Sequence, residues 1–185
     1  MFTLKVNDEI YLRQIALQDA EAVFQLTDQS REYLREWLPW LDQTTRLEDT
    51  KNYIEFSIEG FDNHKSMNNV IVYKDNIVGI AGFNELDWTN KIAYVGYWMG
   101  KGYQGHGIMT KVVEALTDYA FSQLKFNRVE IRAAVENKKS RAIPERLGYK
   151  LEGCVRQVEW LYDHYVDHAI YGVLENEWKK DKNKI

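Results

Sequence analysis

A glycine-dense segment at residues 100–107 (GKGYQGHG) separates a stretch of strand character from a stretch of helix character. Residues 92–99 before it alternate as in a half-buried strand, and after it apolar residues recur at helical spacing to about residue 124. Backbone N–H groups at a helix N-terminus favour negative charge. The segment therefore predicts a strand, a turn and a helix that together bind an anion. A plain connecting turn is the alternative, but it needs only one glycine.

Residues 100–105 also match the Gly-x-Gly-x-x-Gly pattern of dinucleotide-binding turns. We reject nicotinamide or flavin binding, because the preceding strand alternates instead of forming a continuous aliphatic run. An acidic residue at a strand end about 20 residues later is missing as well. A phosphate loop of the Walker type is excluded, because no Gly-Lys-Ser/Thr opens the helix. What remains is a cradle for a pyrophosphate over residues 104–110, where Gly105 and Gly107 leave the backbone open to close approach.

The remaining sequence predicts one α+β domain over residues 1–178 and a short polar C-terminal tail over residues 179–185. No Pro- or Ser-rich linker and no repeat interrupts the 185 residues. We expect a mostly antiparallel mixed sheet of seven strands, at residues 9–15, 69–74, 77–85, 92–99, 128–135, 151–161 and 165–173. Helices on both faces are expected at residues 19–27, 30–38, 49–59 and 108–124, with a short one ending near residue 147. A single cysteine, Cys154, excludes an internal disulfide and a Cys-x-x-Cys site.

The net charge of −4 is unevenly distributed along the chain. Residues 125–156 carry nine basic and four acidic side chains, and residues 1–66 carry seven basic and thirteen acidic ones. The basic block suits a phosphorylated ligand, although a solvated face of a helix and a strand would also explain it. A sequence pI of about 5.6 without a nucleic-acid-binding motif argues against nucleic acid. The longest apolar run is too short for a bilayer and no secretory signal is visible, so we expect a cytoplasmic protein that binds no membrane.

Five further motifs accompany the glycine segment. They are WLPWL at residues 37–41, NKKS at 137–140, RLGY at 146–149, LEG at 151–153 and EWL at 159–161. Gln104 and Gly107 match a Gln/Arg-x-x-Gly-x-Gly/Ala signature, in which Met109 replaces the final small residue. Over roughly residues 8–175 the sequence resembles the GCN5-related N-acetyltransferase (GNAT) superfamily. It is most similar to the RimJ/RimL branch of ribosomal-protein N-acetyltransferases, and there to the YdaF-like members.

The resemblance implies a GNAT fold, a sheet splayed at its central strands, and acetyl-CoA as cosubstrate without a metal. It implies that Met99 pairs its backbone with the pantetheine arm, which Asn137 also contacts. The residues implied to hold the pyrophosphate are Gln104, Gly105, His106, Gly107, Ile108, Met109 and Thr110.

For the reaction, the resemblance implies that Ser140 protonates the leaving thiolate and that Glu159 is the general base. Trp37 and Trp40 would line the acceptor groove. Acetyl transfer from a thioester to an amine needs a neutral amine, a polarised carbonyl and a proton for the sulfur. Glu159 can supply the first of these, and a backbone N–H near Met99 the second.

The cost of deprotonation favours one class of acceptor. An α-amine has a pKa of about 7.7–8.0 and a lysine about 10.4, so deprotonation at pH 7 costs about 1 and about 4.6 kcal/mol, respectively. With one base, the N-terminal α-amine of a ribosomal or other protein is the easier substrate.

Several alternatives stay open from the sequence. The acceptor could be a small amine such as a polyamine, an amino acid or an antibiotic, or the chain could be a CoA-binding module without catalysis. Ser140 could serve only as a helix cap and Glu159 only as a surface carboxylate. His164 and His168 straddle a hairpin turn, and we expect no metal there. The aromatic residues permit a homodimer without requiring one.

Overall fold

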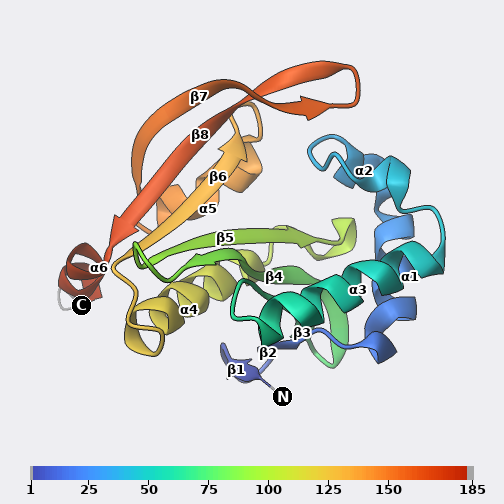
Figure 1. The fold of residues 1–185 in the computed structure, drawn as a ribbon, viewed down its shortest axis with the longest axis horizontal. Coiled ribbons are helices and arrows are strands. Elements are labelled where there is room, and N and C mark those ends of the chain that lie inside the picture. The colour runs from blue at the N-terminus through green and yellow to red at the C-terminus, as the bar shows by residue number, and fades with distance from the viewer. Residues whose placement is uncertain (1, 183–185) are drawn as a thin grey trace.

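An eight-stranded sheet forms the centre of the computed structural model, which describes residues 2–182, with side chains to residue 178 (Figure 1). The strand order is β1-β2-β3-β4-β5-β6-β8-β7, and only β5 and β6 pair in parallel. The strands are β1 (Thr3–Lys5), β2 (Ile10–Gln14), β3 (Met67–Tyr73), β4 (Asn76–Asp87), β5 (Ile92–Met99), β6 (Arg128–Ala134), β7 (Lys150–Leu161) and β8 (His164–Leu174). The predicted fold class is confirmed.

The number of strands differs from the prediction of seven. The additional strand, β1, has only three residues and pairs with β2 through Leu4 opposite Leu12. Three residues are too few for an alternating pattern to stand out in a sequence, so β1 escapes prediction.

Six α-helices and three 3₁₀ turns accompany the sheet. The helices are α1 (Ala20–Gln29), α2 (Arg31–Arg35), α3 (Leu47–Asp62), α4 (Ile108–Ser122), α5 (Lys138–Arg146) and α6 (Glu175–Lys182). The 3₁₀ turns are η1 (Leu17–Asp19), η2 (Leu41–Gln43) and η3 (Lys101–Tyr103). None of the helices in residues 2–182 has the length and apolar character that a membrane span requires.

The two faces of the sheet have separate hydrophobic clusters. On one face, α4 packs its apolar side, including Val112 and Leu116, against strand residues such as Ile71. On the other face, α1 and α3 pack against Val70 and Val72. Successive residues of a strand point to opposite faces, so the continuous apolar run of β3 serves both clusters.

The start of α3 differs from the prediction for a physical reason. The helix begins at Leu47, two residues before the predicted start at residue 49. The Asp49 carboxylate accepts from the backbone N–H groups of Thr45 (3.0 Å) and Arg46 (2.9 Å), and these bonds lower its pKa. Asp49 thus caps the helix from within its first turn.

At the C-terminus, helix α6 continues to Lys182, beyond the predicted start of the polar tail at residue 179. Trp178 anchors this helix, because its ring is buried and its Nε1–H donates to Asp118 (2.7 Å). Residues 183–185 of the predicted tail lie outside the described residues, and the domain boundary stays a prediction.

The sheet opens between β5 and β6. These strands pair only from Ile92 opposite Arg128 to Val95 opposite Ile131. Beyond this point β5 continues to Met99 along β4 while β6 follows β8, and the two strands diverge (Figure 1). The expected splay is therefore present, and it leaves one edge of residues 96–99 without a strand partner.

The tip of the β7–β8 hairpin reaches across to the chain that follows α2. The Tyr162 hydroxyl donates to the Leu38 carbonyl and accepts from the Leu41 N–H (3.2 Å). The guanidinium of Arg35 lies 3.8 Å from the centre of the Tyr162 ring. The hairpin and the residue 38–41 segment are thereby joined above the open part of the sheet.

Candidate active site

Two cavities lie where the sheet is open, and they meet at the end of β5. The first has a volume of about 650 Å³ and extends toward the glycine turn before α4. The second has a volume of about 880 Å³ and extends between β6, the β7–β8 hairpin and the segment after α2. Six residues line both cavities: Trp37, Leu38, Tyr97, Trp98, Asn137 and Ser140. The two cavities therefore adjoin one another at these residues.

The glycine turn gives the first cavity an end that is rich in backbone N–H groups. Gly105 and Gly107 have φ values of 80° and 70°, in the left-handed region that glycine tolerates best. A Cβ atom at either position would meet nothing within 4 Å, so both lie open to a ligand. Gly107 is the N-cap of α4, whose first N–H groups lack acceptors within the helix. A pyrophosphate fits this arrangement.

Seven of the nine residues predicted to bind the cofactor line the first cavity: Met99, Gln104, Gly105, Gly107, Met109, Thr110 and Asn137. The other two do not. The Ile108 side chain is 1% exposed in the hydrophobic core, so only its backbone can face a ligand. His106 is exposed and lies outside the lining of the cavity.

Three cations of the basic block line the same cavity: Lys138, Lys139 and Arg146. The Lys139 Nζ donates to Oε1 of Gln104 (3.3 Å), and the Arg146 Nη2 donates to Oγ1 of Thr110 (3.0 Å). Both contacts bring positive charge to the residues that surround the glycine turn. A merely solvated face does not account for this part of the basic block.

Ser140 lies where the two cavities meet, and its position is fixed by two neighbours. Asn137, not Ser140, caps α5, because its Oδ1 accepts from the Ser140 N–H (3.1 Å). The Tyr97 hydroxyl donates to the Ser140 carbonyl (3.0 Å), and Ser140 Oγ donates to the Tyr97 hydroxyl (3.3 Å). Pro144 has no N–H to offer the Ser140 carbonyl, so Tyr97 replaces the missing helical bond. Burial raises the pKa of Tyr97 to about 12, which keeps its hydroxyl protonated at neutral pH.

Glu159 lines the second cavity together with His168. Oε2 of Glu159 lies 3.1 Å from Nε2 of His168, across the β7–β8 pair. The Glu159 side chain is 29% exposed and the His168 side chain 18%. This half-buried carboxylate is open to the cavity and lies within hydrogen-bond distance of a ring nitrogen.

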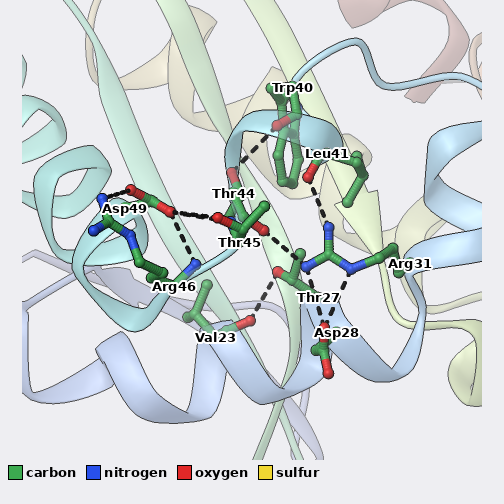
Figure 2. A network of polar contacts seen from close by, with 10 residues as sticks. All are labelled: Val23, Thr27, Asp28, Arg31, Trp40, Leu41, Thr44, Thr45, Arg46 and Asp49. Atoms are coloured by element: carbon green, nitrogen blue, oxygen red, sulfur yellow. Dashed lines mark hydrogen bonds and ion pairs between the residues drawn. The ribbon is translucent and has the colours of Figure 1, made fainter.

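The segment that carries Trp37 and Trp40 also lines the second cavity. Figure 2 shows how the Arg31 guanidinium holds this segment, with donation to the carbonyls of Leu41 (2.7 Å) and Thr44 (2.7 Å). The Thr44 hydroxyl in turn donates to the Trp40 carbonyl (3.3 Å). Trp37 and Trp40, which were predicted to line the acceptor groove, therefore belong to a segment held by these hydrogen bonds, and they line the same cavity as Glu159.

Three residues that line the cavities are not identified by the sequence as part of an active site. The sequence gives no signal for Tyr97 or Arg132 there, and it suggests His168 only as a candidate metal ligand. Tyr97 is 43 residues from Ser140 in the chain, so no local pattern links them. The proline four residues after Ser140 is the one signal in the sequence for an unpaired carbonyl there. No group of three or more His, Cys, Asp or Glu side chains suited to a metal occurs in the described part of the chain.

The sequence matches the family described as "Acetyltransferase (GNAT) domain" over residues 9–150. Among characterised sequences, it is 34% identical to the putative ribosomal N-acetyltransferase YdaF of Bacillus subtilis, an alignment that spans 98% of this chain and all of YdaF. It is 28% identical to the ribosomal-protein-serine acetyltransferase of Escherichia coli, over 91% of this chain and 94% of that protein.

Solved structures agree with these sequence relatives. The microcin C7 self-immunity acetyltransferase MccE, in complex with acetyl-CoA and AMP, superposes with a TM-score of 0.88 at 36% identity, over 92% of this chain and 94% of that one. RimL, a ribosomal L7/L12 α-N-protein acetyltransferase in complex with coenzyme A, gives a TM-score of 0.91 at 28% identity, over 94% and 98% of the two chains. Family match, fold and site together show that this chain belongs to the GNAT family and is an acetyl-CoA-dependent N-acetyltransferase.

Proposed function

We propose that this enzyme acetylates the N-terminal α-amine of a protein, such as a ribosomal protein. The observation that carries the proposal is the meeting of two cavities at Ser140, with Glu159 in the second of them. The names of its relatives, which include ribosomal-protein acetyltransferases, support a protein acceptor.

The first cavity holds the donor in this proposal. The N–H groups at the start of α4 and the cations Lys139 and Arg146 bind the pyrophosphate. The unpaired edge of residues 96–99 binds the pantetheine arm, with Met99 and Asn137 beside it. A backbone N–H of this edge polarises the thioester carbonyl.

The second cavity holds the acceptor. Glu159 takes a proton from the acceptor ammonium, and the free amine attacks the thioester carbonyl. As the new C–N bond forms, the C–S bond breaks, and Ser140 Oγ–H gives its proton to the sulfur. The nitrogen then loses its second proton, which replaces the proton lost by Ser140, and Glu159 releases its proton to solvent. The net products are an amide, a thiol and one proton. An α-amine has a lower pKa than a lysine, so it costs less free energy to deprotonate. With Glu159 as the proposed base, the α-amine is therefore the easier acceptor.

A small-molecule amine is the second candidate acceptor. MccE, which is 36% identical, is a self-immunity acetyltransferase whose structure contains AMP. Three indole rings, those of Trp37, Trp40 and Trp98, line the second cavity here and offer flat surfaces to an aromatic group. The rings of Trp40 and Trp98 are 6.0 Å apart, centre to centre.

Steady-state kinetics with acetyl-CoA and a panel of acceptors would test both candidates. The panel contains peptides with free and blocked N-termini, a lysine side-chain amine, a polyamine and an aminoacyl nucleotide analogue. We expect peptides with free N-termini to have the highest kcat/KM. A nucleotide analogue that outperforms every peptide would establish the small-molecule acceptor instead.

The variants Ser140→Ala and Glu159→Gln test the residue assignment. Loss of one acid or base lowers kcat by roughly 10²–10⁴-fold, whereas acetyl-CoA should still stabilise both variants against heat. Exposed residues of the same types, in Ser122→Ala and Glu55→Gln, serve as matched controls. Wild-type turnover in both site variants would show that the catalytic assignment is wrong.

A further inference from the structure

We propose that Arg132 forms an oxyanion subsite in the second cavity, which binds a carboxylate or phosphate that the acceptor carries beside its reacting amine. The inference rests on the proposed function, because it takes Glu159 as the group that receives the amine. It adds a second point of recognition and thereby names a chemical class of acceptor.

The first observation is the state of the Arg132 side chain. Arg132 lines the cavity, and its side chain is 45% exposed. Its Nε donates to Oε1 of Glu130 (2.6 Å), and the guanidinium carbon lies 5.8 Å from the centre of the Tyr94 ring. No residue of the described chain accepts from Nη1 or Nη2 of Arg132. The guanidinium is thus oriented at one nitrogen and leaves the other two free to bind both oxygens of an oxyanion.

The second observation is the order of charges behind Arg132. The Glu130 side chain is only 8% exposed, and its other oxygen accepts from Nη2 of Arg128 (2.8 Å). Arg128 also donates two bonds to Glu152 (2.7 and 2.5 Å). The four charged groups form a row of alternating sign. The row begins with Arg132 at the cavity, continues through Glu130 and Arg128, and ends with Glu152. If Arg132 were absent, Glu130 would still be paired with Arg128. The need to neutralise Glu130 therefore does not by itself explain why an arginine stands at position 132.

The third observation is the composition of the cavity wall. Arg132 is the one Lys or Arg among the described residues that line the second cavity. The carboxylates in the same wall are those of Asp49, Glu130 and Glu159. Asp49 is engaged by backbone N–H groups of its own helix start, and Glu130 by two arginines. Glu159 and Arg132 therefore remain as a negative and a positive point for a ligand.

The register of the strands sets the spacing of these two points. On β8, His168 lies opposite Ala134 of β6, and Ile170 lies opposite Arg132. His168, the partner of Glu159, and Arg132 therefore lie on neighbouring strands, about 7 Å apart along the strands and about 4.8 Å apart across them, or roughly 8 Å between their backbone positions. A peptide with an acidic side chain at its second or third residue spans this distance, and so does an amine joined to a phosphate.

The test compares ligands that differ only in the oxyanion. C-terminally amidated tripeptides of sequence Ser-Asp-Ala and Ser-Ala-Asp are compared with amidated Ser-Asn-Ala and Ser-Ala-Asn, as acceptors in kinetics and as ligands in calorimetry with the CoA-saturated enzyme. AMP is the probe for a phosphate. In the wild type we expect at least one Asp peptide to bind about ten times more tightly than its Asn counterpart, or AMP to bind about ten times more tightly than adenosine, in line with a charge-assisted contact at a half-exposed site.

The variant Arg132→Gln keeps a donor for Glu130 and removes the guanidinium fork. We expect it to lose the preference for the oxyanion, so that each Asp peptide binds like its Asn counterpart and AMP binds like adenosine. Arg156→Gln, an exposed arginine on β7, is the matched control and should keep the preference. Tighter binding of the Asp peptides would identify a carboxylate, and tighter binding of AMP a phosphate.

Two results separate the possible failures. If wild type and Arg132→Gln bind Asp peptides, Asn peptides and AMP with the same relative affinities, the subsite does not exist. If no peptide is acetylated but the oxyanion preference in binding is lost in Arg132→Gln, the subsite stands and the protein acceptor is wrong. Calorimetry measures binding without turnover, so the second result can be obtained even with a peptide that the enzyme does not acetylate.

Discussion

Pro144 shapes the reaction centre without touching a substrate. In α5 it leaves the carbonyl of Ser140 without a helical donor, and the hydroxyl of Tyr97 fills that place. One phenol thereby holds the carbonyl of Ser140 and accepts from its Oγ. The serine that we propose as proton donor is oriented by a bond that an uninterrupted helix would not allow.

The first prediction concerns this phenol. Tyr97→Phe removes both bonds to Ser140, and the half-buried carbonyl loses its donor, at a cost of about 0.5–1.5 kcal/mol. We expect kcat to fall about tenfold or more with KM for acetyl-CoA little changed, because the glycine turn is untouched. Tyr165→Phe, on the exposed face of the hairpin, is the control. An unaltered kcat in Tyr97→Phe would mean that Ser140 needs no support from Tyr97.

A second prediction follows from the protonation of Tyr97. Burial raises its pKa from 10.0 to about 12, so the folded state holds this proton more tightly than the unfolded state. The stabilisation is fully present below pH 10 and is lost as the pH rises through 12. Two pH units correspond to about 2.7 kcal/mol. The unfolding free energy of the wild type should fall more steeply between pH 10 and 12 than that of Tyr97→Phe, and parallel curves would contradict this account.

At the scale of single residues, sequence reasoning reached the groups that lie in motifs and missed those brought in by the fold. Ser140 and Glu159 belong to motifs that carry the family resemblance. Tyr97 and Arg132 belong to strands. The alternation of apolar and polar residues in a strand indicates on which face of the sheet a side chain lies, but not which residues from other elements it contacts there. Their partners become neighbours only when β5 and β6 diverge.

At the scale of elements, the strand, turn and helix around the glycine segment are the part that the sequence predicted best. Strand β5 matches the predicted residues 92–99, and α4 begins at the predicted residue 108. The period of apolar residues changes sharply there, and the glycines mark the turn. The start of α3 was harder to predict, because Asp49 stabilises the helix from its third position rather than from the cap.

A third prediction tests the glycine turn. Gly107→Ala places a side chain at φ 70°, which costs about 1–2 kcal/mol in the left-handed region, although the new Cβ would meet nothing within 4 Å. We expect acetyl-CoA to bind about 5- to 30-fold more weakly, because the turn relaxes away from the geometry that presents its N–H groups. Gly153→Ala also adds a Cβ in open space, but without a positive φ, and should bind acetyl-CoA like the wild type. Isothermal calorimetry measures both, and equal affinities would show that the turn tolerates a side chain.

At the scale of the whole molecule, two long-range contacts join parts of the chain that no local pattern relates. Tyr162 bonds to Leu38 and Leu41 over more than 120 residues of sequence. The single α+β fold could be predicted because each element has its own periodicity. The closure of the second cavity could not, because it depends on how far the hairpin reaches.

The fourth prediction uses the stability of the whole chain. A ligand at 100 times its dissociation constant stabilises a protein by about 2.7 kcal/mol, which for this length raises Tm by roughly 5–11 °C. We expect such a shift in thermal unfolding with acetyl-CoA and with CoA, and none with NADH at the same concentration. A shift with NADH alone would mean that the Gly-x-Gly-x-x-Gly pattern had been rejected wrongly.

The contact between the hairpin tip and the residue 38–41 segment has a topological consequence. With Tyr162 bonded to the backbone of that segment, the hairpin tip and the segment form a continuous connection along one side of the second cavity. A polypeptide laid across that side would meet this connection, whereas a chain end could enter beside it. Under the proposed function, the connection would therefore favour a chain terminus over an interior lysine of a folded surface, before any chemistry distinguishes one amine from another.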